Sequence, residues 1–173
     1  MTDLEIRTAI LADLGTIEGL LTEASVWLAS LGIDQWQYPP HRDRIVQAIE
    51  RGECFLAVQD GHPIATLQVD SFADPEFWGV SDRPDAALYV HRMAVSREAA
   101  GGSVGKELLN WAVDRATAAG KSWLRLDAWK DNPGLHRYYE RRGFELVRIV
   151  DLPHRRSGAL YQRPTGPTHD ISP

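Results

Sequence analysis

Residues 93–109 read Met-Ala-Val-Ser-Arg-Glu-Ala-Ala-Gly-Gly-Ser-Val-Gly-Lys-Glu-Leu-Leu. An apolar, β-branched run leads into a glycine-rich turn, and the start of an amphipathic helix follows. Gly101, Gly102 and Gly105 let the backbone come close to a ligand, and the small residues leave its N–H groups uncovered. Free N–H groups and the positive end of the helix dipole form an anion site. The stretch therefore predicts a strand, a turn and a helix that together bind a phosphate group.

Composition limits what kind of protein this is. At 173 residues the chain is long enough for one domain with a real core, and 43% hydrophobic and 25% charged content is ordinary for a soluble globular protein. A formal charge of -5 argues against nucleic-acid binding, which requires a basic face. No stretch has signal-peptide or membrane-span character, so we expect no membrane partner and a cytoplasmic location.

Cysteine and histidine usage gives no metal site. The lone Cys54 leaves no intramolecular disulfide and no cysteine-based site. Five of the six histidines are scattered through turns and helix faces without ligand spacing, namely His41, His62, His136, His154 and His169. We therefore expect no bound metal.

Hydrophobic periodicity and turn residues outline the elements. We expect strands at 4–8, 54–58, 64–69, 86–95, 121–129 and 144–150, with a short addition at 160–163, and helices at 17–31, around 45–49, at 104–119 and from Asn132-Pro133 to before Gly143. The Asp60-Gly61 pair predicts a type I′ hairpin turn. Residues 70–85 are expected to form a long irregular loop. This order indicates an α/β sheet with helices on its faces.

The chain divides into a domain at 1–163 and a short tail at 164–173. The tail is rich in Pro, Thr and Asp, and we expect it to be disordered.

Two nucleotide-binding patterns are excluded by specific residues. Gly105-Lys106 suggests a P-loop, but that pattern needs Gly at position 100 and Ser or Thr at 107, where this chain has Ala100 and Glu107. Glu107 offers no hydroxyl to magnesium and places a negative charge beside phosphates. The dinucleotide pattern Gly-x-Gly-x-x-Gly is absent as well.

A second motif, Asn132 followed by Tyr139-Glu-Arg-Arg-Gly-Phe144, lies one helix and one strand after the first. Together the two motifs resemble the acyl-CoA-binding core of the GNAT superfamily of acetyl-CoA-dependent N-acetyltransferases, over about residues 5–150. The resemblance implies a single-domain, mixed and mostly antiparallel sheet of six to seven strands with helices on both faces. It also implies acetyl transfer from acetyl-CoA to a primary amine by direct attack in a ternary complex.

The turn departs from the family pattern at two positions. Ala100 stands where the pattern has Arg or Gln, and Ser103 where it has an inner Gly. Main-chain N–H groups hold most of the pyrophosphate in the family, so Gly101 and Gly102 can supply the flexibility and Ser103 a hydroxyl donor. The alternative is a catalytically silent acyl-CoA-binding protein of the same fold, acting as a sensor or scaffold.

The resemblance also implies which residues bind acetyl-CoA. Backbone groups on the strand pair with the pantetheine arm, and one N–H there, at Met93 or its neighbour, faces the acetyl carbonyl. The expected cofactor-binding residues are Met93, Ala94, Val95, Gly101, Gly102, Ser103, Val104, Gly105, Lys106, Asn132 and Tyr139. For Asn132 helix capping alone is an equal alternative, and Lys106 is nearly as well explained as a solvated residue.

Tyr139 is the expected general acid. A phenol has a reference pKa of about 10, near that of an alkyl thiol, so proton transfer to the leaving CoA sulfur is nearly balanced. Its offset from Gly143-Phe144 matches the family motif. The competing interpretation is a half-buried tyrosine on an amphipathic helix.

His91 is the expected general base, because histidine titrates close to working pH. Period-two alternation puts Tyr89, His91 and Met93 on one face of the strand. Several arylalkylamine acetyltransferases of the resembled family carry histidine at the matching position. A structural histidine bonding across the sheet, with a water chain or another residue as base, is the alternative.

The sequence leaves the acceptor open. It is a small-molecule amine or a peptide amine, and a homodimer is an open expectation because dimers are common in the family. Aromatic residues of the entry helix and the 70–85 loop suggest the acceptor pocket, namely Trp27, Trp36, Tyr38, Phe77 and Trp78. The loop's acids could attract a cationic amine. The favoured interpretation is that the tryptophans are core and the acids solvated.

Overall fold

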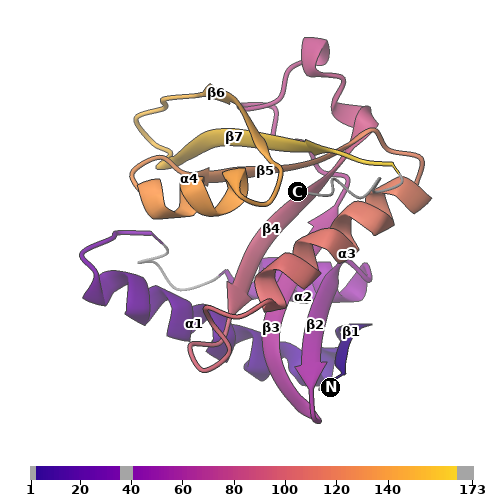
Figure 1. Ribbon diagram of the computed structural model, residues 1–173, viewed down its shortest axis with the longest axis vertical. Helices are drawn as coiled ribbons and strands as arrows, with labels where there is room; N and C mark the ends of the chain where they lie inside the picture. Colours follow the sequence, from indigo (N-terminus) through magenta and orange to yellow (C-terminus); the bar gives the residue numbers. More distant parts are fainter. Residues whose placement is uncertain (1–2, 36–40, 167–173) are drawn as a thin grey trace. The chain divides into compact units, whose positions relative to one another are not determined.

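The computed structural model describes residues 3–35 and 41–166 (Figure 1). Its strands are β1 Leu4–Thr8, β2 Cys54–Gln59, β3 His62–Asp70, β4 Ala87–Val95, β5 Trp123–Trp129, β6 Glu145–Ile149 and β7 Ser157–Pro164. Its α-helices are α1 Leu14–Ser30, α2 Arg42–Glu50, α3 Val104–Ala118 and α4 Pro133–Glu140.

These strands form one mixed sheet in the order β1-β2-β3-β4-β5-β7-β6. The β4–β5 pair is parallel, whereas β1–β2, β2–β3, β5–β7 and β6–β7 are antiparallel. The predicted mixed, mostly antiparallel α/β architecture is therefore confirmed. Within the described ranges, no helix has both the length and the apolar character that crossing a membrane requires.

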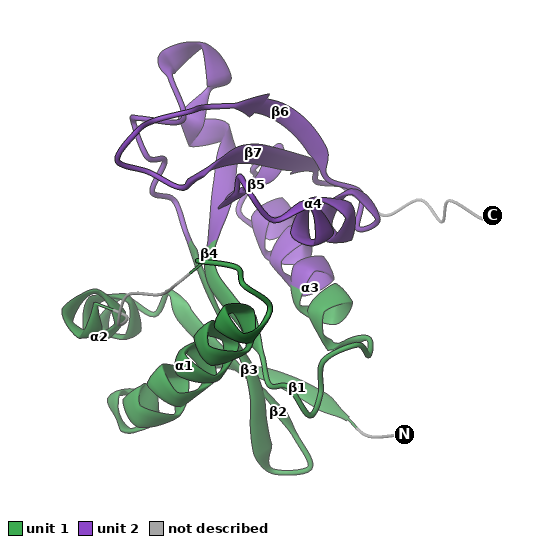
Figure 2. Ribbon diagram, turned by 90° about the vertical axis from the view of Figure 1, so that its left-hand side faces the viewer, with its two compact units in different colours: residues 1–69, 91–108 green, residues 70–90, 109–173 purple. Residues whose placement is uncertain are grey.

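The chain divides into two compact units (Figure 2). Unit 1 comprises Met1–Val69 and His91–Leu108, and unit 2 comprises Asp70–Val90 and Leu109–Pro173. The boundaries fall inside β3, β4 and α3, so each of these elements contributes residues to both units.

In unit 1, α1 and α2 bury their apolar faces against β2. The core includes Ile17 and Leu21 from α1, Ile45 from α2 and Leu56 from β2. The predicted hairpin turn is present, with φ of 51° at Asp60 and 79° at Gly61, as a type I′ turn requires. β2 and β3 both extend closer to this turn than the expected strand ends at 58 and 64. The register of the β2–β3 pairing shifts between Ala57 and Val58.

In unit 2, the β5–β7–β6 strands pack with α4 on one side, and both views in Figures 1 and 2 show α4 beside these strands. A separate core cluster joins Phe77, Trp78, Ala87, Tyr89 and Leu160. The short strand expected at 160–163 is longer, because β7 begins at Ser157 and pairs on both sides. Residues in the first half of β7 are buried on both faces, so this part of the sequence lacks the alternation of apolar and polar residues that predicts a strand.

The predicted irregular loop at 70–85 contains short regular turns. Two 3-10 helices, Val80–Asp82 and Pro84–Ala86, lead into β4. At the other end of the unit, Thr165 N–H donates to the carbonyl of Ser122 at 3.0 Å and Gly166 N–H to Thr117 Oγ1 at 3.1 Å. The expected disorder of the tail is therefore wrong for residues 164–166, because Pro164 ends β7 and the next two residues are hydrogen-bonded. The remainder of the predicted tail, residues 167–173, lies outside the described residues.

Candidate active site

The turn between β4 and α3, residues 96–103, is called the glycine loop below. It starts with a hydrogen bond from Ser96 N–H to the carbonyl of Ile64 at 2.8 Å, and Ala99 N–H closes a turn onto Ser96 at 3.1 Å. Gly101 has φ +84°, a left-handed conformation that favours glycine. Gly102 has no such φ, and a Cβ there would only contact the carbonyl of Ala99 at 3.5 Å. The predicted need for glycine is thus confirmed at Gly101.

Backbone N–H groups from Gly101 to Lys106 have no acceptor among the described residues. The first helical bond of α3 is donated by Glu107 N–H to the carbonyl of Ser103 at 2.9 Å. The first turn of any α-helix leaves its N–H groups unpaired, and the helix dipole adds positive potential there. Six consecutive peptide donors are therefore available to an anion.

Side chains at the start of α3 pair with each other. The Ser103 hydroxyl donates to Glu107 Oε1 at 2.5 Å, so it faces a carboxylate. Lys106 and Glu107 are both exposed, which places one positive and one negative side chain beside the unpaired amides. Phosphate contact by Ser103 or Lys106 stays a prediction.

Strand β4 carries the predicted base and the pantetheine-pairing residues. His91, Met93 and Val95 are half-buried and Ala94 is buried. Arg92, between His91 and Met93, has φ +47°, which is not an extended conformation. The left-handed φ at Arg92 is a local irregularity within β4, which is one strand from Ala87 to Val95. The shared face of Tyr89, His91 and Met93 stays a prediction.

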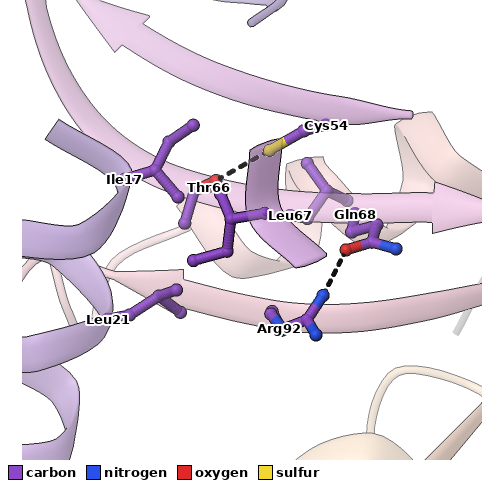
Figure 3. Close-up of a pocket in the computed structure, with 8 residues that line it drawn as sticks. Ile17, Leu21, Cys54, Thr66, Leu67, Gln68 and Arg92 are labelled. Atoms are coloured by element: carbon purple, nitrogen blue, oxygen red, sulfur yellow. Dashed lines mark hydrogen bonds between the residues drawn. The ribbon is translucent and has the colours of Figure 1, made fainter. Parts of the chain in front are cut away.

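Arg92 also marks a small cavity in unit 1 (Figure 3). Its guanidinium donates to Gln68 Oε1 at 2.6 Å on the polar side. Ile17 and Leu21 of α1 form part of the apolar wall, and Thr66 donates to the carbonyl of Phe55 at 3.0 Å. Left-handed non-glycine residues within strands concentrate at functional sites, which draws attention to this part of β4.

In unit 2, Tyr139 lies on α4 with only 8% of its surface exposed. Its ring packs against Tyr138, Phe144 and Tyr161 at centroid distances of 5.5, 5.7 and 6.1 Å. Burial, with smaller contributions from Tyr138 and Asp127, raises the pKa of Tyr139 well above its usual value. The hydroxyl has no hydrogen-bond partner among the described residues. Tyr139 is thus a protonated donor at neutral pH.

Asn132 caps α4, as expected. Its Oδ1 accepts a hydrogen bond from Leu135 N–H at 3.1 Å, and Pro133 follows at the first helical position. His136 Nε2 lies 2.7 Å from the carbonyl oxygen of Trp129, which ties the helix to the end of β5. Contact between Asn132 and a ligand stays a prediction.

Three carboxylates of residues 70–86, called the acidic loop below, pair with arginines. Asp82 accepts two hydrogen bonds from Arg148 at 2.9 and 2.6 Å, and this pairing lowers the pKa of the Asp82 carboxyl. Asp74 and Glu76 both bind Arg155, at 2.8 and 2.9 Å. These carboxylates are neutralised within the unit.

Phe77 and Trp78 of the acidic loop are core, whereas Phe72 is exposed. The expectation that the tryptophans are core is therefore confirmed for Trp78 and wrong for Trp27, which is exposed on α1. Phe77 and Trp78 are 2% and 3% exposed. Two guanidinium groups lie near the Trp78 ring, that of Arg125 at 4.7 Å and that of Arg148 at 5.9 Å from its centroid. Trp36 and Tyr38 lie outside the described residues.

Arg125 was not recognised from the sequence. It is 4% exposed and donates to the carbonyl of Asp82 at 2.6 Å and to Gln162 Oε1 at 3.1 Å. Asp127 of β5 accepts a hydrogen bond from the Ser157 hydroxyl of β7.

Comparison with known proteins decides the family. The model of the acetyltransferase (GNAT) family matches residues 21–144, which is most of the chain. The chain belongs to this family. It is accordingly an N-acetyltransferase, and the resemblance inferred from the two sequence motifs is confirmed.

The similarity to known proteins extends over most of the chain. The uncharacterized N-acetyltransferase YesJ of Bacillus subtilis (strain 168) is 33% identical over 145 residues, covering 80% of each protein. A GNAT family acetyltransferase from Listeria monocytogenes superposes with a TM-score of 0.78 at 25% identity, covering 93% of this chain and 94% of the other. The PaiA N-acetyltransferase from Thermoplasma acidophilum, solved in complex with coenzyme A, has a TM-score of 0.74 at 18% identity, covering 94% and 99%.

Proposed function

We propose that this N-acetyltransferase moves the acetyl group of acetyl-CoA to a primary amine by direct attack in a ternary complex. The observation that carries the proposal is the run of unpaired N–H groups from Gly101 to Lys106. Membership of the GNAT family supports acetyl-CoA as the donor, and PaiA, of the same fold, was crystallised with coenzyme A.

The donor is bound mainly by backbone groups in this proposal. Amides of residues 101–106 hold the diphosphate of coenzyme A, where an anion meets both the N–H donors and the helix dipole. The backbone of Met93, Ala94 and Val95 pairs with the pantetheine arm, and Asn132 adds a polar contact to it. One strand N–H, at Met93 or its neighbour, donates to the acetyl oxygen and stabilises the oxyanion that forms there.

Bond making and breaking then involve two side chains. The neutral amine nitrogen attacks the acetyl carbon, the new C–N bond forms, and the C–S bond breaks to release the CoA thiolate. His91 takes the proton that the amine loses, directly or through water. Tyr139 gives its phenolic proton to the departing sulfur. The phenol is in its donor form across the neutral range, and because burial raises its pKa it is a weaker acid than the nearly balanced transfer expected from the sequence.

A two-part experiment tests the proposal. Binding of coenzyme A is measured by calorimetry, and thiol release from acetyl-CoA is followed with a panel of polyamines, aminoglycosides, amino acids, peptides and aryl amines. We expect CoA binding and amine-dependent, saturable thiol release. No CoA binding would overturn the proposal. Binding without turnover on any amine would instead favour the silent acyl-CoA sensor or scaffold.

The role of His91 has its own test. If His91 is the base, its protonation at low pH stops catalysis, so the pH–rate profile has an acidic limb. We expect His91→Ala to lower turnover about 100-fold and to remove that limb. A His91→Ala profile that keeps the parent's acidic limb would rule out His91 and leave the proton to water or another residue.

A further inference from the structure

Arg97, in the glycine loop, is held at both its main chain and its side chain by one face of α1. Its N–H donates to Glu23 Oε1 at 2.8 Å, and its guanidinium carbon lies 3.6 Å from the centroid of the Trp27 ring. Glu23 and Trp27 are one helical turn apart and therefore neighbours on the helix surface. Figures 1 and 2 both show the segment after β4 beside α1.

These two contacts connect residues about seventy positions apart, and hydrophobic burial does not account for them. Trp27 keeps 38% of its surface exposed and is absent from the unit 1 core. A hydrogen bond to a carboxylate is stronger than one between neutral groups, and a guanidinium over a tryptophan face adds a cation–π attraction. One half-buried side chain of α1, Glu23, and one exposed side chain, Trp27, thus both contact a single residue of the loop.

The contacts fix the loop on the side away from α3. Ser96 N–H is bonded to Ile64, Arg97 N–H to Glu23, and the far end is fixed by the first helical bond from Glu107 to Ser103. The unpaired N–H groups from Gly101 to Lys106 lie between these fixed points. A ligand that binds an already ordered loop loses less conformational entropy on binding.

We propose that Glu23 and Trp27 are positioning residues that hold the glycine loop in its acetyl-CoA-binding conformation. The inference rests on the proposed function, because it takes the bound anion to be the diphosphate of coenzyme A. Neither side chain touches the reacting atoms. Their loss therefore weakens donor binding and leaves the chemical step intact.

The test separates donor affinity from turnover. We expect Glu23→Ala to raise the Kd for coenzyme A and the KM for acetyl-CoA by about five- to tenfold. The kcat at saturating acetyl-CoA and the KM for the amine stay within about twofold. Glu23→Gln, whose amide oxygen can accept the same N–H, should bind nearly as well as the parent. Glu18→Ala is the matched control, because Glu18 lies on the same helix but faces Arg42, at 3.7 Å.

A second measurement reports the contact without activity. Amide hydrogen exchange at Arg97 should be slow in the parent and in Glu23→Gln, and faster in Glu23→Ala. The proposal is overturned if Glu23→Ala binds coenzyme A within twofold of the parent, or if Glu23→Gln is as impaired as Glu23→Ala. A parent protein that shows the protected Arg97 amide but no affinity for coenzyme A would overturn the proposed function instead.

Discussion

The glycine loop and the acidic loop differ in whether their polar groups have hydrogen-bond partners within the protein. In the glycine loop and the first turn of α3, six successive N–H groups have no acceptor within the described part of the chain. In the acidic loop, Asp74, Glu76 and Asp82 are all paired with arginines of the same unit. Unpaired polar groups cost stability unless a ligand or water satisfies them, whereas paired ones hold a loop in place.

This difference assigns ligand binding to the glycine loop and structural stabilisation to the acidic loop. Changes in the glycine loop should alter affinity for coenzyme A more than stability, and changes in the acidic loop should do the reverse. Unit 2 contributes one clear exception, because the hydroxyl of Tyr139 is unpaired among the described residues although its ring is buried.

The largest effect is expected at that exception. Tyr139→Phe removes only the hydroxyl and keeps the ring contacts with Phe144 and Tyr161. If Tyr139 protonates the leaving thiolate, turnover should fall at least about tenfold, while the Kd for coenzyme A changes little. Steady-state kinetics and calorimetry measure the two quantities. Tyr138→Phe, one position earlier, serves as the control, and unchanged turnover in Tyr139→Phe would remove Tyr139 from the mechanism.

A smaller effect is expected from Gly101→Ala. A left-handed φ costs a residue with a Cβ about 1 kcal/mol, which corresponds to about fivefold weaker binding of coenzyme A if the loop shifts to relieve it. The loop is exposed, so the unfolding temperature should change little. Gly102→Ala is the matched control, because its φ is ordinary and its Cβ fits. Equal weakening by the two variants, or none by either, would contradict the backbone argument.

In the acidic loop the expected change is in stability. Asp82→Asn should cost about 1 kcal/mol, a modest value because Arg148 keeps 40% of its side chain exposed. The pairing lowers the pKa of Asp82 in the folded state. Its stabilisation is therefore complete above the unfolded-state pKa of about 3.9 and disappears as pH falls through the lower folded-state value.

Urea unfolding of the parent and of Asp82→Asn, at neutral pH and at pH values below about 4, measures this difference. The gap in the free energy of unfolding should narrow on acidification. Affinity for coenzyme A, measured at neutral pH, should stay unchanged. A gap that widened on acidification, or a large loss of affinity, would contradict the division between the two loops.

The sequence predicts features that depend on neighbouring residues. Asp60-Gly61 predicted a turn with two positive φ values, and Asn132-Pro133 predicted the start of α4, because each conformation is set within a few residues. The glycine loop is predictable for the same reason, since Gly101 and the free first turn of α3 need no distant partner.

Features that depend on distant partners could not be predicted. Arg148 binds Asp82 across 66 positions and Arg97 binds Glu23 across 74, and no periodicity encodes either pair. The first half of β7 was not predicted, because its residues are buried on both faces and therefore do not alternate between apolar and polar. The left-handed conformation of Arg92 has no signal in its residue type, because arginine does not favour a positive φ.

The smallest effect is expected at the start of α3, where the comparison between the loops is least clear-cut. Glu107 engages the Ser103 hydroxyl and places a negative charge beside the anion site. Glu107→Gln removes that charge and still accepts from Ser103, so affinity for coenzyme A should rise about two- to threefold. The gain should shrink at high salt, because exposed charges are screened. Ser103→Ala, which removes the hydroxyl but keeps the charge, should leave affinity nearly unchanged. If Ser103→Ala instead weakened binding about as much as Gly101→Ala, the hydroxyl would leave Glu107 for the phosphate on binding, and the backbone amides would share the anion with a side chain.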